Sequence, residues 1–276
     1  MTEVKSVLIT GCSTGIGLDA AKQLHDKGFD VYATARKPQD VEQLRALGLN
    51  AKVLDLDDEI SIRNALKWVL EQSGGELHAL FNNGAYGQPG AIEDLPTEAL
   101  RAQFETNLFG WHSLTKAVLP IMRKQGFGRI IQCSSVLGLV AMPYRGAYNA
   151  SKFALEGYTD TLRLELRGTD IHVSLIEPGP IDTQFRANAL EKIHQYIDIE
   201  HSVHRSNYEP QVKRLASRQT STQFTLPASA VTKKLEHALT AKRPKIRYYV
   251  TFPTYLMAVL KRLIPFSWLD SILVKN

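Results

Sequence analysis

The chain has 276 residues, of which 44% are hydrophobic and 22% are charged. These proportions are ordinary for a globular protein, and the length favours one large α/β domain over two small ones. The net charge of +5 is mildly basic, but no run of lysine and arginine is dense enough to predict a nucleic-acid surface. A site for a polyanionic small molecule or an anionic membrane surface would account for this charge, although it needs no specific cause.

The cysteine content and the apolar runs indicate where the protein works. Cys12 and Cys133 are the two cysteines, and neither belongs to a C-x-x-C pair. We therefore expect a reducing compartment and no metal site built on thiolates. The apolar run near the N-terminus is too short for a signal peptide, and the longest uncharged stretch, residues 248–260, is too short to span a bilayer. These features predict a cytoplasmic protein.

The first predicted strand, residues 7–10, is continuously apolar, as expected of a strand buried on both faces of a parallel sheet. A glycine-rich turn with the spacing G-x-x-x-G-x-G follows at residues 11–17, and a helix is predicted from about 18 to 27. A strand, a glycine turn and a helix in this order direct backbone N–H groups and the helix dipole at a phosphate. The turn residues that we expect to contact a dinucleotide are Gly11, Ser13, Thr14, Gly15, Ile16 and Gly17.

The second predicted strand, residues 30–34, is followed by Ala35, Arg36 and Lys37. An acidic residue here would accept a hydrogen bond from the ribose 2′-hydroxyl of NAD, whereas an arginine accommodates the 2′-phosphate of NADP. The two cations therefore predict NADP(H), and the Ser13 hydroxyl could reach the same phosphate. The alternative is a pair of solvated loop charges.

Two further strands are predicted at residues 51–56 and 77–81. Asp55, next to Leu56, lies where a carboxylate could accept a hydrogen bond from the adenine amino group. Asn82, Asn83 and Gly84 follow the next strand, at the edge of the sheet where open α/β folds bind ligands.

A long helix is predicted at residues 97–125, with Asn107 near its middle. Asparagine is disfavoured in helix interiors because its amide competes with backbone hydrogen bonds. Asn107 is therefore either incidental or bends the helix to expose a carbonyl.

The remaining strands are predicted at residues 128–133, 171–177 and 245–250. The first delivers Ser134 and Ser135 to the ligand-binding edge, and the second delivers residues 178–183, which include Pro178, Gly179, Ile181 and Thr183. Strands alternate with helices along the chain. This alternation predicts a Rossmann-like, doubly wound parallel sheet of about seven strands with helices on both faces.

Tyr148 and Lys152 are four residues apart at the start of a segment with apolar residues at helical spacing. An ammonium beside a phenol stabilises the phenolate and lowers its pKa from about 10. Tyr148 would then donate and accept a proton near neutral pH. Taken alone, the pair could be a chance helical neighbour.

Residues 184–228 break the alternating pattern and are polar and mixed. His194, His201 and His204 lie here, but no carboxylate or cysteine has a spacing that supports a metal site. Long irregular segments in compact domains are usually functional, so we expect a mobile substrate lid.

The tail, residues 251–276, is apolar with Lys261, Arg262 and Trp268 interleaved, a pattern typical of a helix that rests on a membrane surface. The alternative is packing against the body of the protein or a neighbouring subunit through Leu256, Val259, Leu260 and Leu263.

Taken together, the motifs resemble those of the short-chain dehydrogenase/reductase family, in its single-domain branch. The matching segments are T-G-C-S-T-G-I-G at 10–17, N-N-G-A at 82–85, Asn107, Ser135, Tyr148, Lys152 and P-G at 178–179. The resemblance is firm over about residues 5–183. It is strongest to bacterial NADP-dependent aldehyde reductases, with hydroxysteroid and retinol dehydrogenases as relatives. One departure is N-N-G-A where the family more often has N-N-A-G, and both forms keep a small flexible turn.

The resemblance implies an NADP(H)-dependent oxidoreductase that interconverts an apolar carbonyl and an alcohol. Tyr148 would protonate the carbonyl oxygen, Lys152 would lower the pKa of Tyr148 and hold the nicotinamide ribose, and Ser135 would polarise the carbonyl. Asn107 would position a water that links Lys152 to solvent. The cofactor-binding set that follows is Gly11, Ser13, Thr14, Gly15, Ile16, Gly17, Arg36, Lys37, Asp55, Leu56, Asn83, Gly84, Tyr148, Lys152, Pro178, Gly179, Ile181 and Thr183.

Two other functions fit parts of the pattern. A non-catalytic dinucleotide-binding protein should have lost Tyr148, Lys152 or Ser135, and this chain keeps all three. A nucleotide-sugar epimerase or dehydratase shares Tyr-x-x-x-Lys, but the glycine spacing and the limited room for a sugar domain disfavour it. The resemblance also implies a homodimer or homotetramer assembled through the helices that bear Asn107 and Tyr148.

Overall fold

The computed structural model describes residues 5–217 and 223–274. Its central sheet has seven strands in the order β3-β2-β1-β4-β5-β6-β9, and every neighbouring pair is parallel. The strands are β1 (Ser6–Ile9), β2 (Asp30–Ala35), β3 (Asn50–Val53), β4 (Ala79–Asn82), β5 (Gly128–Cys133), β6 (Ile171–Glu177) and β9 (Arg247–Tyr249). The Rossmann-like fold predicted from the sequence is confirmed.

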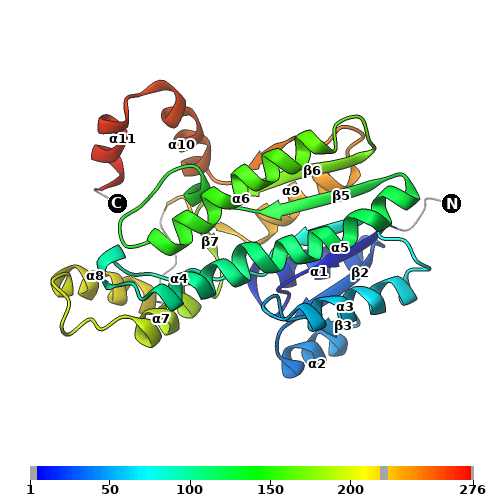
Figure 1. Ribbon diagram of the computed structural model, residues 1–276, viewed down its shortest axis with the longest axis horizontal. Helices are drawn as coiled ribbons and strands as arrows, with labels where there is room; N and C mark the ends of the chain where they lie inside the picture. Colours follow the sequence, from blue (N-terminus) through cyan, green and yellow to red (C-terminus); the bar gives the residue numbers. More distant parts are fainter. Residues whose placement is uncertain (1–4, 218–222, 275–276) are drawn as a thin grey trace.

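Helices cover both faces of this sheet, which gives three layers. The helices are α1 (Gly15–Asp26), α2 (Pro38–Ala46), α3 (Glu59–Gln72), α4 (Thr97–Phe104), α5 (Gly110–Gln125), α6 (Gly146–Glu165) and α9 (Ser229–Thr240). In Figure 1, α5 and α6 lie in front of the sheet and α9 lies behind it; α3 packs beside α5, and α1 packs against α9. Because both faces are covered, the central strands are buried and read as continuous apolar runs, such as Val7, Leu8 and Ile9 in β1.

The strand order reverses between β1 and β4, which lie side by side at the centre of the sheet. In open α/β sheets, ligands bind in the crevice outside the carboxyl ends of the strands at this point. The segments that leave β1, β4, β5 and β6 at that edge begin with Thr10, Asn83, Ser134 and Pro178. The topology therefore brings the predicted cofactor and catalytic segments to one edge of the sheet.

The predicted helix at residues 97–125 is helical throughout but is not uniform. A π-helical segment, η2 (Glu105–Phe109), separates α4 from α5, and Asn107 is at its centre. A π-bulge changes the backbone hydrogen-bond pattern and is frequent at functional sites. Of the two alternatives for Asn107, the one in which it alters the helix agrees with this geometry.

The segment predicted as an irregular lid is mostly helical, so that part of the prediction is wrong. It contains α7 (Phe185–Tyr196) and α8 (Arg205–Ala216), and β7 (Ile181–Asp182) pairs with β8 (Leu226–Pro227) at its two ends. The buried residues Ala189 and Ile193 in α7, and Tyr208 and Leu215 in α8, stabilise helices within a polar sequence. Residues 218–222 lie outside the described part of the chain.

The apolar tail forms a helical hairpin made of α10 (Phe252–Leu263) and α11 (Phe266–Leu273). Ala258, Leu269 and Leu273 are buried against Leu139 and Val140. Leu260 contacts this cluster, as the packing alternative predicted, whereas Leu256, Val259 and Leu263 are 38%, 52% and 74% exposed, and their packing against a neighbouring subunit stays a prediction. None of the helices in the described ranges has the length and apolarity needed to cross a bilayer.

Candidate active site

The glycine turn after β1 is packed so tightly that side chains would not fit. Gly11 has a φ of +71°, and a Cβ there would lie 2.5 Å from the Cα of Gly84. A Cβ on Gly17 would lie 2.2 Å from the carbonyl oxygen of Gly11. The turns after β1 and β4 are also joined by Thr10, whose Oγ1 accepts the N–H groups of Asn83 and Gly84, both at 2.9 Å. The two turns therefore form one rigid unit.

The side chain of Asn83 stabilises this unit by hydrogen bonds. Its Nδ2 donates to the carbonyl oxygens of Thr10 at 2.9 Å and Gly11 at 3.2 Å. Asn83, which we predicted to bind the cofactor, therefore stabilises the glycine turn.

The N-terminus of α1 opens onto the same turn. Thr14 is its N-cap residue and makes no side-chain capping hydrogen bond, and the first turn, which is fully described, contains no acidic residue. The free N–H groups and the positive end of the helix dipole suit an anion. A Cβ on Gly15 would lie 3.1 Å from the Thr183 side chain, so the turn after β6 borders this position. These residues fit the pyrophosphate of a dinucleotide.

Arg36 and Lys37 are exposed directly after β2. Burial raises the pKa of Asp57, and the nearby Arg36 cation opposes this shift. Asp55 accepts the N–H of Asp57 at 3.1 Å and so shapes the turn after β3. Leu56 is buried beneath Gly84. The end of β2 therefore presents two exposed cations.

The Ser135 side chain lies close enough to the Tyr148 phenol to lower its pKa, and both residues are buried. Ser135 Oγ also accepts the N–H of Leu137 at 3.1 Å, which fixes its position at the start of the 3₁₀ turn η3 (Val136–Gly138). The Tyr148 ring packs edge-on against Phe185 of α7, with ring centroids 5.4 Å apart. Two hydroxyls thus converge at an aromatic wall that the predicted lid supplies.

Lys152 lies one turn after Tyr148 on α6 and is also buried. Its Nζ donates to the carbonyl oxygen of Cys133 at 2.8 Å and is 4.4 Å from the centroid of the Trp111 ring. Burial lowers the pKa of Lys152 to about 8.

The pKa of Tyr148 differs in direction from the sequence prediction. Burial raises it above its ordinary value, although the hydrogen bond from Ser135 lowers it. Lys152 points to the Cys133 carbonyl, with Nζ 5.6 Å from the centroid of the Tyr148 ring, so desolvation outweighs the cation.

Asn107 is fully buried and links the π-helical segment to the turn after β4. Its Oδ1 accepts the N–H of Tyr86 at 3.2 Å, and its Nδ2 donates to the Tyr86 carbonyl at 2.9 Å and to Ser151 Oγ at 3.3 Å. Ser151 in turn donates to the carbonyl of Tyr148 at 2.9 Å. Asn107 thereby fixes the position of α6 relative to the cofactor edge.

The turn after β6 is held against the C-terminal hairpin. The N–H of Val136 donates to the carbonyl of Pro178 at 2.8 Å. A Cβ on Gly179 would lie 2.1 Å from Oγ1 of Thr251, the N-cap residue of α10. Ile181 pairs with Leu226 in the short second sheet. The predicted P-G motif therefore contacts both the Ser135 turn and the first residues of the tail.

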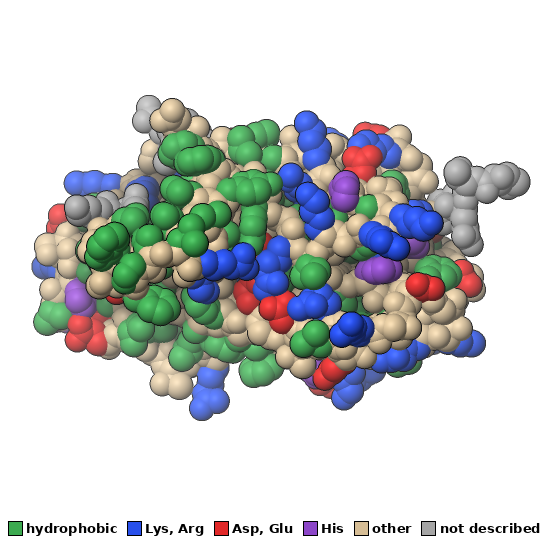
Figure 2. All heavy atoms as spheres, turned by 90° about the horizontal axis from the view of Figure 1, so that it is seen from above, with side chains coloured by type: hydrophobic (Ala, Val, Ile, Leu, Met, Phe, Trp, Pro, Cys, Tyr) green, Lys and Arg blue, Asp and Glu red, His purple; other side chains and the backbone are tan. Residues whose placement is uncertain are grey.

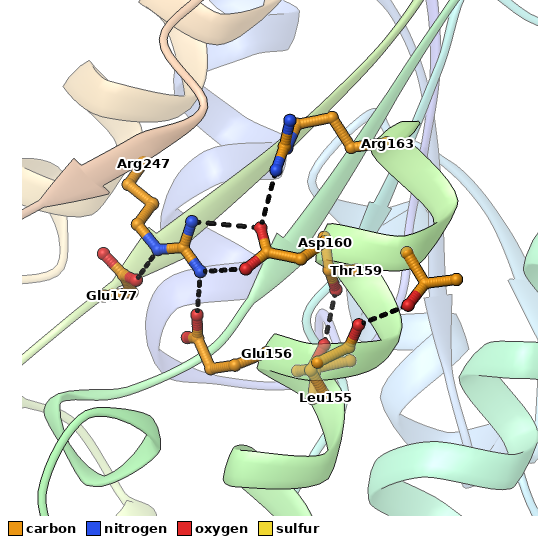
Figure 3. Close-up of polar contacts among 9 residues, drawn as sticks. Leu155, Glu156, Thr159, Asp160, Arg163, Glu177 and Arg247 are labelled. Carbon is orange, nitrogen blue, oxygen red and sulfur yellow. Dashed lines mark hydrogen bonds and ion pairs between the residues drawn. The ribbon is translucent and has the colours of Figure 1, made fainter. Parts of the chain in front are cut away.

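Sequence reasoning missed a buried charge cluster beside this site (Figure 3). Arg247 of β9 contacts Glu177 at 3.2 Å, Glu156 at 3.0 Å and Asp160 at 2.8 Å. Glu177, the last residue of β6, directly precedes Pro178, and Glu156 lies one turn after Lys152 on α6. The signals in the sequence were a carboxylate at the end of the buried strand β6 and another on the buried face of α6.

The cluster has three carboxyl groups and two guanidinium groups, because Arg163 also contacts Asp160 at 3.2 Å. Hydrogen bonds from Arg247 lower the pKa of Asp160. Burial raises the pKa of Glu156, and burial together with the charge of Glu156 raises the pKa of Glu177 to about 9. Like-charged carboxyls in a shared buried site cannot both ionise cheaply, so the pair retains a proton at neutral pH.

Two of the three histidines of the predicted lid contact carboxylates. His201 Nδ1 is 2.8 Å from Asp198, and His204 contacts Glu93. Across residues 5–217 and 223–274 there is no group of three or more His, Cys, Asp or Glu residues that could hold a metal ion.

Comparisons with known proteins agree with this geometry. The family model for short chain dehydrogenases matches residues 5–194. The chain belongs to the short-chain dehydrogenase/reductase family, whose members are oxidoreductases that bind a nicotinamide dinucleotide and act on carbonyl or alcohol groups.

Three curated relatives and one solved structure illustrate the similarity. An uncharacterized oxidoreductase of Escherichia coli, YbbO, is 42% identical over 98% of this chain and 94% of its own. The 3-ketodihydrosphingosine reductase of Bacteroides thetaiotaomicron is 41% identical over 66% of each chain. The NADPH-dependent 3-dehydrocapnine reductase of Ornithobacterium rhinotracheale is 31% identical over 99% and 97%. A short-chain dehydrogenase from Streptomyces avermitilis, 24% identical over 99% and 94%, has the same fold with a TM-score of 0.78.

Proposed function

We propose that the protein is an NADP(H)-dependent oxidoreductase that reduces apolar aldehydes or ketones. The observation that carries this proposal is the burial of the Ser135 and Tyr148 hydroxyls next to each other, with the Lys152 ammonium one helical turn away. A scaffold that only bound a dinucleotide would have no need to bury these three groups together, because each burial costs free energy.

The cofactor supplies the hydride when it is bound. The glycine turn and the N-terminus of α1 would hold its pyrophosphate, and the Pro178–Gly179 turn would border the nicotinamide. Lys152 would hold the ribose hydroxyls, as the family resemblance implies. Asp55 would lie near the adenine, and Arg36 and Lys37 near the 2′-phosphate.

The protein's own groups supply the proton. Tyr148 donates its phenolic proton to the substrate oxygen, and Ser135 donates a hydrogen bond to the same oxygen, stabilising the charge that develops there. The lowered pKa of Lys152, about 8, places this group near its titration point, so it can return a proton to Tyr148. Asn107 would position the water through which Lys152 exchanges protons with solvent.

NADP(H) is preferred over NAD(H) because of the charges after β2. Ala35 occupies the position where an acidic residue would bind a ribose 2′-hydroxyl, and Arg36 and Lys37 are exposed beside it. One full-length relative carries the word NADPH-dependent in its name.

The substrate should be apolar because the surroundings of Tyr148 are apolar. Phe185 packs on its ring, and the Ser135 turn leads directly into Leu139 and Val140. Two relatives are named as reductases of 3-ketodihydrosphingosine and 3-dehydrocapnine. We therefore favour long-chain carbonyl compounds.

An NADPH-oxidation assay with aldehydes from propanal to dodecanal tests the proposal. Each methylene that becomes buried contributes about 0.8 kcal/mol, a factor of about four in kcat/KM, until the pocket is filled. All-trans-retinal and a 3-ketosteroid test the alternative of a retinol or hydroxysteroid dehydrogenase, and glyceraldehyde serves as the polar control. A flat series, or best activity on glyceraldehyde, would contradict the apolar substrate.

Three further parts of the proposal concern organisation. All 276 residues form one oxidoreductase domain in which α7 and α8 act as a substrate lid. The protein assembles as a homodimer or homotetramer through the helices that bear Asn107 and Tyr148. It works in the cytoplasm. Gel filtration with light scattering tests the assembly.

A further inference from the structure

The two helices of the C-terminal hairpin carry large apolar side chains on their outer side. We call this surface the hairpin face; it consists of Phe252, Tyr255, Leu256, Val259, Leu263, Phe266, Trp268 and Ile272. Figure 2 shows apolar side chains gathered over α10 and α11, with lysine and arginine side chains beside them. A contiguous apolar surface of this kind marks an interaction site.

The hairpin face is a property of both helices and not of single exposed residues. In α10, its residues recur at intervals of three and four, while Thr254 and Ala258 on the opposite side are buried. In α11, Trp268 and Ile272 point outward while Leu269 and Leu273 pack against the body. Each helix therefore has two apolar sides. One side packs against the body of the protein, and the other faces outward.

We propose that the hairpin face docks on the surface of an anionic lipid bilayer. Arg262 borders it on the hairpin, Lys261 lies over the Phe153 ring of α6 at 4.8 Å, and residues 237–269 contain no Asp or Glu. Aromatic and leucine side chains combined with a basic border are the pattern of helices that lie in the membrane interface. Cations near the surface attract anionic headgroups, so charge and apolarity act together.

A second copy of the chain fits this surface less well. A two-fold contact places the same patch on both sides, so the Arg262 side chains of the two copies would approach each other. Asp270 is the only acidic residue that the hairpin offers to balance them. A bilayer containing anionic lipid has no such conflict.

The position of the hairpin gives this docking a consequence for substrate access. The hairpin packs on Leu139 and Val140, which follow Ser135 in the chain, and α10 begins at Thr251 against Gly179. Phe224, which precedes β8, stacks on Phe252 of the hairpin face with ring centroids 5.4 Å apart. The docked face therefore adjoins the segments around the catalytic hydroxyls. A long-chain substrate dissolved in the bilayer would enter from this side, a route that rests on the proposed function, whereas the docking does not.

Co-sedimentation with vesicles tests the docking without any activity measurement. The full-length protein should bind vesicles of equal parts phosphatidylcholine and phosphatidylglycerol, and bind more weakly to phosphatidylcholine alone. Leu263→Glu and Trp268→Glu should each weaken binding on the order of tenfold, since each removes a large apolar contact. Both side chains are mostly exposed, at 74% and 66%, so the fold should tolerate the change. Ile60→Glu on α3, at a position 60% exposed, is the matched control and should bind like the wild type.

Tryptophan fluorescence adds an independent readout. Trp111 is buried and Trp68 is half-buried, so a blue shift on adding vesicles should come from Trp268 and disappear in Trp268→Phe while sedimentation persists. Equal sedimentation of Leu263→Glu and wild type would overturn the proposal. The proposal would also be overturned if the wild type formed a dimer that Leu263→Glu dissociates and did not bind vesicles. Vesicle binding by a protein that oxidises no NADPH would leave the docking intact and refute the proposed function instead.

Discussion

The Glu156–Glu177 pair makes a quantitative prediction about stability and pH. The pKa of Glu177 is raised from 4.5 to about 9 by burial and by the charge of Glu156, so the folded protein holds a proton that the unfolded chain releases. A raised carboxyl pKa contributes its full stability below the unfolded pKa, and this contribution is lost as the pH rises toward the folded pKa. Within that window the free energy of unfolding falls by about 1.4 kcal/mol per pH unit.

The interval from pH 6.5 to 8 separates this effect from those of other groups. Burial lowers the pKa of His78 to about 4, which affects stability mainly below pH 6.5, and the lowered pKa of Lys152, about 8, acts mainly above pH 8. Over this interval the Glu177 contribution should decline by about 2 kcal/mol. Glu177→Gln keeps the shape of the protonated group and cannot ionise, so it should abolish the decline and be more stable than wild type at pH 8.

Urea unfolding followed by circular dichroism at both pH values measures the effect. Glu165→Gln, an exposed position on α6, is the matched control and should keep the wild-type dependence on pH. A wild-type unfolding free energy that is constant or rises from pH 6.5 to 8 would show that Arg247 keeps both carboxyls ionised. An unchanged slope in Glu177→Gln would lead to the same conclusion.

Two other variants test the site directly. Tyr148→Phe should lower kcat by roughly 10²–10⁴-fold, the usual value of a general acid, and leave NADPH binding by fluorescence nearly intact; Tyr158→Phe on the same helix is the control, and more than half of wild-type turnover in Tyr148→Phe would contradict the role. Ala35→Asp combined with Arg36→Ser should reverse the preference for NADPH, because losing an arginine–phosphate contact costs about 1.5–3 kcal/mol and the new carboxylate repels the phosphate. Arg63→Ser is the control for that pair, and equal kcat/KM with NADPH and NADH in the wild type would mean that Arg36 does not contact the cofactor.

The fold was predictable because its signals are local and repeated. Each central strand is a short apolar run followed by turn residues, and the predicted strands at residues 128–133 and 171–177 match β5 and β6 without any shift. The crevice was predictable for the same reason, since parallel strands bring their carboxyl ends to one edge.

The lid and the charge cluster were harder to predict because tertiary contacts decide them. Tyr208 is polar and aromatic in sequence, yet its hydroxyl contacts Asp94 and the N–H of Ala91, both at 2.8 Å, and its ring is buried. Helix α8 is therefore stabilised by residues more than a hundred positions away, which no periodic pattern records. Arg247 likewise meets Glu156 and Glu177 only because β9 pairs with β6.

The charge cluster explains how one site can combine segments from so many parts of the chain. Arg247 connects α6, which carries Tyr148 and Lys152, to the end of β6, where the Pro178–Gly179 turn begins. Buried ion pairs add little stability compared with apolar packing, but they fix a single arrangement of the elements that they join. Replacing Glu177 by glutamine mimics the protonated acid and should leave kcat near the wild-type value, whereas Arg247→Met removes the contacts with Glu156, Asp160 and Glu177 and should lower kcat. A fully active Arg247→Met variant would show that apolar packing alone positions the site.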